Sequence, residues 1–139
     1  RPSKAPLQAL KDPTMLARYK IHRGKRPADD PLPNGIRQDT RKHTKHCLRP
    51  TVEIVTVYLA NPMSAAWEEF KAEYERILTA RYEIDVVPFD ELAQLATEND
   101  VYIGCSCPTQ KNPDVARCHT VLALAFMEDH YPKLNVAYP

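Results

Sequence analysis

The chain has 139 residues, of which 43% are hydrophobic and 27% charged, and its formal net charge at pH 7 is +1. This length fits one domain with a packed core. No apolar run approaches the ~20 residues that span a bilayer, and the first twenty residues lack the apolar centre of a signal peptide. The four cysteines are too few for a disulfide scaffold. We therefore expect a cytoplasmic protein with reduced thiols and no membrane partner.

The small net charge conceals an asymmetry along the chain. Residues 1–50 hold 13 Lys or Arg and 4 Asp or Glu, a net of +9, whereas residues 51–139 hold 6 and 14, a net of −8. Residues 1–50 also contain 7 of the 13 prolines. We expect an extended, proline-rich basic arm over 1–50 and an α/β domain over 51–139. The arm either binds nucleic acid or packs against its own acidic domain.

In chain order, the arm contains one predicted strand near Ala17–His22 and turn residues over Arg26–Gly35. Beyond it, strands and helices alternate. β-branched and apolar runs predict strands over Thr51–Ala60, Tyr82–Phe89, Val101–Cys105 and Lys133–Tyr138. Capping residues and helical spacing predict helices over Ser64–Ala80, over Glu91–Asn99 after Asp90, and over Asn112–His130.

The helix over Ser64–Ala80 carries one apolar face, made of Trp67, Phe70, Tyr74, Ile77 and Leu78. This aromatic stripe indicates core packing. Alternating strands and helices predict a single compact α/β domain with a mainly parallel sheet flanked by helices. The three glycines do not form a phosphate-binding fingerprint.

Three of the four cysteines lie close together in the sequence, between Val101 and Phe126. Cys105 ends a predicted strand, Cys107 follows about 6.6 Å further at ~3.3 Å per residue, and Cys118 and His119 begin a predicted helix. Ligands of open α/β sheets bind at the carboxyl ends of strands, and helix N-termini favour anions. The stretch is therefore the predicted functional site.

Four interpretations of this stretch remain open. The cysteines and His119 could bind zinc as a tetrahedral set, although the side chains of Cys118 and His119 diverge by ~100° if both are helical. Cys118 could be a reactive thiolate with His119, or a histidine distant in the sequence, as its catalytic base. Arg117 and the helix N–H groups could hold a phosphate, with Cys105 and Cys107 lining the wall. The cysteines could also be small buried hydrophobic residues.

These residues resemble the domain-of-unknown-function 488 family of small bacterial and archaeal proteins. The likeness lies in the helix sequence WEEFKAEYERIL, in Gly104-Cys105-Ser106-Cys107 and in Arg117-Cys118-His119, and it covers roughly residues 64–131. Many members of the family have arginine after Cys-His, where this chain has Thr120. The resemblance implies a compact α/β domain with a shared Cys-His feature and no established activity.

A second basic stretch, over Gly35–Thr51, contains Arg37 and Arg41. If these arginines fold over the strand ends, they join Arg117 in one anion pocket. The sequence thus predicts a phosphate-bearing ligand, a nucleotide or nucleic acid, bound at the loop from Cys105 to His119, with or without catalysis. The alternatives are a zinc-stabilised interaction protein and a cysteine-dependent redox or transfer enzyme.

Overall fold

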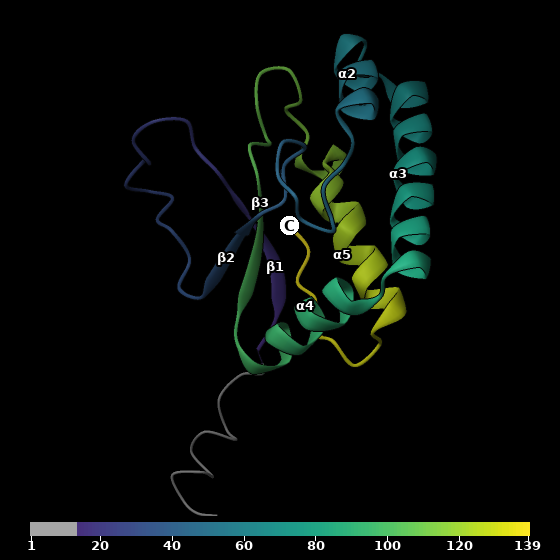
Figure 1. Cartoon of the computed structure of the whole chain (residues 1–139). Coiled ribbons are helices and arrows are strands. Elements are labelled where there is room, and N and C mark those ends of the chain that lie inside the picture. The colour runs from purple at the N-terminus through teal and green to yellow at the C-terminus, as the bar shows by residue number, and fades with distance from the viewer. Residues whose placement is uncertain (1–13) are drawn as a thin grey trace, which may run out of the picture.

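The computed structural model describes residues 14–139 and shows one three-stranded sheet packed against helices (Figure 1). The strands are β1 (Leu16–Lys20), β2 (Ile36–Asp39) and β3 (Val101–Cys105). Their order is β1-β3-β2, and both pairs are parallel. The prediction of a single α/β domain with a parallel sheet is confirmed.

Both outer strands come from the segment that was expected to form an arm. The strand predicted near Ala17–His22 is β1, and β2 was not predicted. Since β3 pairs with both strands, a boundary at residue 50 would separate the central strand from its two partners. From residue 14 onward, the basic segment therefore belongs to the fold of its own domain. Residues 1–13 of the predicted arm lie outside the described residues.

The α-helices of this part of the chain are α2 (Val52–Ala60), α3 (Ser64–Ile84), α4 (Val87–Glu98) and α5 (His119–His130). In Figure 1 they lie on one side of the strands, with α5 between the sheet and α3, and α5 contacts β1, β3 and α3. Among the residues described, no helix is long and apolar enough to cross a membrane. The strands and α5 together carry the residues of the candidate site.

The core contains the apolar face predicted for the helix from Ser64. Trp67, Phe70, Tyr74 and Leu78 are buried in α3, and the rings of Trp67 and Phe70 stack with their centroids 5.3 Å apart. Leu16, Val101 and Ile103 of the sheet and Leu124 and Met127 of α5 belong to the same cluster. This cluster holds the N-terminus of α5 against the carboxyl end of β3.

The prediction of a strand over Thr51–Ala60 is wrong, because these residues form α2. Thr51 adopts an extended conformation and its side chain accepts a hydrogen bond from the backbone N of Ile54, which caps the helix. Tyr58 is buried and packs its ring against Trp67 of α3. Packing against α3 thus outweighs the β preference of the valines and isoleucine, which is a weak and context-dependent preference.

Two further predicted strands are replaced by other structure. Over Tyr82–Phe89, α3 ends at Ile84 and α4 begins at Val87, with Pro88 in its first turn, where a proline costs no helical hydrogen bond. The segment Lys133–Tyr138 makes only a single bridge, from Val136 to Leu16. Neither segment therefore adds a strand to the sheet.

The predicted start of the last helix is also corrected. Asp114 caps a short 3-10 turn over Val115–Arg117, its side chain accepting a hydrogen bond from the N of Ala116, and α5 starts only at His119. Cys118 lies between the two in an extended conformation. Arg117 therefore lies before α5 and outside its first turn.

Candidate metal centre and its pocket

The structure brings Cys105, Cys118 and His119 together at the carboxyl end of β3. One ligand atom of each residue, a sulfur or a ring nitrogen, lies within 4.8 Å of the corresponding atoms of the other two, and all three residues are buried. Strand β3 supplies Cys105, and the start of α5 supplies the other two. These three residues form a cluster that can hold a metal ion.

The conformation of Cys118 explains how two adjacent residues point to one place. With φ −122° and ψ 146°, Cys118 is extended, and only His119 is helical. The divergence of ~100° expected for two helical neighbours therefore does not arise. Sγ of Cys118 lies 3.9 Å from Nδ1 of His119, so the sulfur and the ring nitrogen face the same space.

The hydrogen bonds of Thr40 determine which nitrogen of His119 carries the proton. Burial lowers the pKa of His119 to about 4, so the ring is neutral and has one N–H. The Thr40 hydroxyl donates to the carbonyl oxygen of Gly104 at 3.0 Å and lies 2.9 Å from Nε2 of His119. Because the Thr40 hydroxyl donates its only proton to Gly104, it can only accept a hydrogen bond from His119, and the donor is Nε2–H. Nδ1 is left with a free lone pair beside Cys118.

Cys107 lies next to this cluster, and a buried amide fixes its position. Nδ2 of Asn112 donates to Sγ of Cys107 at 3.3 Å and to the carbonyl oxygen of Arg117 at 2.7 Å, while Oδ1 accepts from the Tyr58 hydroxyl at 3.0 Å. Hydrogen bonds from the thiols of Cys105 and Cys118 lower the pKa of Cys107. The same pairing with Cys107 raises the pKa of Cys105. Of the three thiols, Cys107 is thus the one whose pKa is lowered, whereas the pKa values of Cys105 and Cys118 are raised.

A second hydrogen-bonded chain supports Cys118. The hydroxyl of Thr120 donates to Sγ of Cys118 at 3.1 Å and accepts from Nε of Arg18 at 2.9 Å. The same guanidinium donates to the carbonyl oxygen of Cys107 at 2.8 Å. Arg18 of β1 therefore brings a positive charge next to Thr120 and the thiols from another part of the chain.

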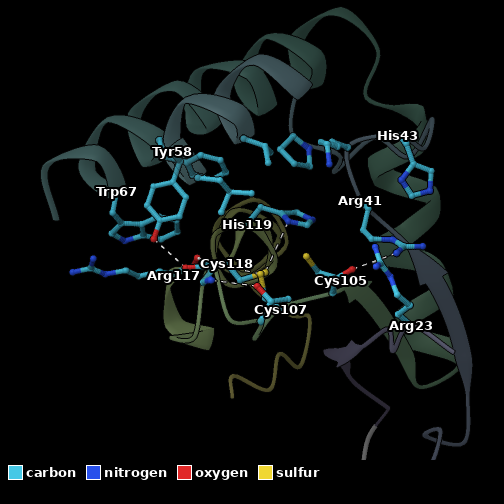
Figure 2. A pocket seen from close by; sticks show the side chains of 18 residues that line it. Arg23, Arg41, His43, Tyr58, Trp67, Cys105, Cys107, Arg117, Cys118 and His119 are labelled. Carbon is cyan, nitrogen blue, oxygen red and sulfur yellow. Dashed lines mark hydrogen bonds between the residues drawn. The ribbon is translucent and has the colours of Figure 1, made fainter. Parts of the chain in front are cut away.

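The three thiols line a pocket of about 320 Å³, which lies between the sheet and the pair α2 and α3. Figure 2 shows the sulfurs between an aromatic end, with Tyr58 and Trp67, and a cationic end, with Arg23, Arg41 and His43. Apolar side chains close the aromatic end: Val55, Tyr58, Leu59, Trp67 and Phe70. The pocket therefore has mostly apolar side chains, with Arg117 beside them, at one end and a group of cations at the other, with the cysteines and His119 along its middle.

Most of the predicted anion-binding residues line this one pocket, including Arg41 and Arg117. Arg41 forms a bidentate ion pair with Asp39, with Nη2 2.8 Å from Oδ2, and Nη1 donates to Ser106. Arg117 lies on the aromatic side and donates to the hydroxyl of Ser64 at 2.9 Å. Arg37 lies elsewhere: it is exposed and donates to the carbonyl oxygen of Pro33.

Sequence reasoning missed the residues that support the cluster, namely Arg18, Thr40, Tyr58, Asn112 and Thr120. Arg18, Thr40 and Tyr58 contact partners 102, 79 and 54 positions away in the chain, so no local motif contains them. Thr120 and Asn112 lie two and five positions from the cysteines that they contact. Asn112 had been assigned only to a helix start.

Comparisons with protein families, with curated proteins and with solved structures give no match. The functional conclusion therefore rests on the geometry of the cluster and its pocket.

Proposed function

We propose that the protein binds a soft divalent metal ion, zinc in the first instance, through Sγ of Cys105, Sγ of Cys118 and Nδ1 of His119. The convergence of these three ligand atoms within 4.8 Å is the observation that carries the proposal. Thiolates and imidazole are preferred ligands of zinc, and three protein ligands leave a fourth position free. Cys107, whose Sγ accepts a hydrogen bond from Asn112 beside the cluster, is the candidate for that position, and would complete the quartet expected from the sequence.

The surroundings of the cluster support metal binding over inert burial. A ligating histidine usually donates its second ring N–H to a protein acceptor, as Nε2 of His119 does toward Thr40. Hydrogen bonds from Asn112 and Thr120 to two of the sulfurs favour their thiolate forms. Buried cysteines that only fill space do not require polar donors aimed at their sulfurs.

The test is the metal content of protein purified without chelator. Elemental analysis should give near one equivalent of zinc for the wild type, and much less for Cys118→Ser or His119→Ala. Cys47→Ala is the matched control, because Cys47 is a half-buried cysteine outside the cluster. Cobalt-substituted protein should show sulfur-to-cobalt charge-transfer absorption that Cys118→Ser weakens. Equal metal content in wild type and cluster variants would contradict the proposal.

The second candidate function is binding of a phosphate-bearing ligand in the same pocket. It is favoured by the cations at one end, where Arg23 and Lys42 take part in no ion pair among the residues described. Charge-assisted hydrogen bonds from such groups are the strong contacts of phosphate sites. We therefore place the phosphate at the end of the pocket that holds Arg23, Arg41 and Lys42, and not beside Arg117.

A titration with inorganic phosphate and AMP, followed by calorimetry, tests this second function. Arg23→Met and Lys42→Met should each weaken binding several-fold, whereas Lys133→Met, on the exposed C-terminal segment, should leave it unchanged. Membership of the domain-of-unknown-function 488 family, nucleic-acid binding and catalysis by Cys118 and His119 stay predictions that these experiments do not address.

A further inference from the structure

A second hollow, of about 710 Å³, adjoins the pocket on its cationic side. The two hollows share the residues Arg23, Arg41, Ser106 and Thr109. The second one is bordered by the end of β1 and by the loop after Cys107, and it is lined by more basic than acidic side chains. The two hollows adjoin at Arg23 and Arg41, and we refer to them together as the groove.

Positive charge accumulates in this groove, and only part of it is paired with carboxylates. Lys20 and Lys111 line the second hollow, and Arg23 lines both. Across residues 14–139, none of these three side chains forms an ion pair, whereas Arg41 is paired with Asp39. Like charges that face one groove repel one another, and a bound anion would remove that repulsion. A single phosphate beside Arg23 and Arg41 would leave Lys20 and Lys111 of the second hollow without an anionic partner.

We infer that the groove binds an organic diphosphate, which deepens the phosphate-binding function proposed above and rests on it. The organic group lies in the first hollow toward Trp67 and Phe70, and the first phosphate lies at the shared boundary beside Arg23 and Arg41. The terminal phosphate lies between Lys20 and Lys111. Nucleoside diphosphates and isoprenoid diphosphates share this chemistry, since each joins a flat or apolar group to two adjacent phosphates.

The apolar lining of the aromatic end argues for a small molecule over a nucleic-acid strand. Val55, Leu59 and Phe70 of α2 and α3 line the first hollow, and these side chains suit a flat or apolar group better than the charged backbone of a strand. The first hollow has a volume of about 320 Å³, within the range of sites that enclose a small ligand, roughly 300–1,000 Å³. The second hollow, of about 710 Å³, adds the part lined by Lys20 and Lys111.

Calorimetry at constant ionic strength tests the inference, with ADP, AMP, dimethylallyl monophosphate and dimethylallyl diphosphate as probes. We expect at least one diphosphate to bind about tenfold or more tightly than its monophosphate, as one added charge-assisted contact provides. Lys20→Met and Lys111→Met should remove that difference and leave monophosphate binding unchanged. The matched control is Lys25→Met, an exposed lysine that borders neither hollow. The two organic groups distinguish a nucleotide from an isoprenoid ligand.

The possible results distinguish diphosphate binding from binding of a single phosphate in the same pocket. Monophosphates that bind as tightly as their diphosphates, and are unaffected by Lys111→Met, would overturn the second phosphate position while leaving the phosphate site in place. If none of the four probes binds, both the second phosphate position and the phosphate site itself are overturned. A single-stranded oligonucleotide that bound more tightly than every diphosphate would overturn the small-molecule assignment. Repeating the titrations after treatment with chelator makes each result independent of the metal proposal.

Discussion

The hydroxyl of Thr40 and Nε2 of His119 lie 2.9 Å apart, although the two residues are 79 positions apart in the chain. Thr40 follows β2 directly, and His119 is the first residue of α5. Both are buried. This hydrogen bond therefore ties the edge of the sheet to the candidate metal centre and fixes the ring nitrogen that faces the thiols.

Thr40→Val removes the acceptor of this bond while preserving the shape of the side chain. We expect metal affinity to fall by about 10–100-fold, the usual effect of losing an outer partner of a ligand. The buried Nε2–H is left unsatisfied, which costs about 1–3 kcal/mol of unfolding free energy. Competition with a chromophoric chelator and urea unfolding measure the two effects. Thr40→Ser keeps the hydroxyl and should bind metal much as the wild type does; equal losses in both variants would contradict the explanation.

Thr120 should control the pH at which Cys118 accepts a metal ion. Its hydroxyl donates to Sγ of Cys118 and is itself held by Arg18, which stabilises the thiolate relative to the thiol. Since metal ions bind the thiolate, Thr120→Val should shift the midpoint of zinc loading to higher pH, whereas Thr120→Ser should not. Zinc loading measured from pH 5 to 8 checks this expectation. If Thr120→Val changes the free energy of unfolding but not the pH midpoint of zinc loading, Thr120 contributes to packing and not to the thiolate of Cys118.

The elements that the sequence predicted correctly are those whose signals are local. Strand β3 ends at Cys105 as predicted, because a short apolar run is followed there by loop residues, and the aromatic stripe from Trp67 to Leu78 is the buried face of α3. The position of Cys105, Cys118 and His119 followed from the rule that sites form at strand ends. Of the four residues that the sequence singled out, the structure brings Cys105, Cys118 and His119 within 4.8 Å of one another.

Several of the failures depend on packing or pairing that the local sequence pattern does not contain. A continuous apolar run such as Thr51–Ala60 suits a buried strand or a buried helix equally, and only the packing of Tyr58 against Trp67 selects the helix. The strand Ile36–Asp39 lacks a strong β signal and forms through its pairing with β3. Arg18 and Thr40, which support the cluster, contact it across 102 and 79 positions.

Stability should depend on pH through the half-buried His46 and the buried His119. Burial lowers the pKa of both His46 and His119 to about 4, below the value of about 6.5 for an unfolded chain. As pH falls below 6.5 the unfolded state takes up protons that the folded state does not. The stabilising contribution is thus complete above pH 6.5 and is lost as pH falls toward 4, by up to about 1.4 kcal/mol per pH unit for each histidine.

His46→Asn separates the two contributions. The asparagine oxygen can replace Nδ1 as acceptor for the backbone N of Leu48, but the side chain does not titrate. Urea unfolding of metal-free protein between pH 7 and pH 5 should therefore show about half the pH slope of the wild type. His43→Asn, at a position with an exposed side chain, is the control. An unchanged slope in His46→Asn would mean that His46 is not held neutral by its surroundings.

Gly35 should be far less replaceable than Gly24, although both have positive φ. Gly35 has φ +142°, and a Cβ there would lie 2.6 Å from the backbone oxygen of Asp100, which accepts the hydrogen bond from the N of Ile36 at the start of β2. Gly24 has φ +73° and open space around it. Gly24→Ala should cost about 1–2 kcal/mol of unfolding free energy, from backbone strain alone.

Gly35→Ala adds a collision with the backbone and should cost about 2–6 kcal/mol of unfolding free energy. Because β2 leads directly to Thr40, Gly35→Ala should also weaken metal binding, whereas Gly24→Ala should not. Urea unfolding and zinc competition on both variants measure these differences, and equal costs at the two positions would show that β2 is not held against Asp100.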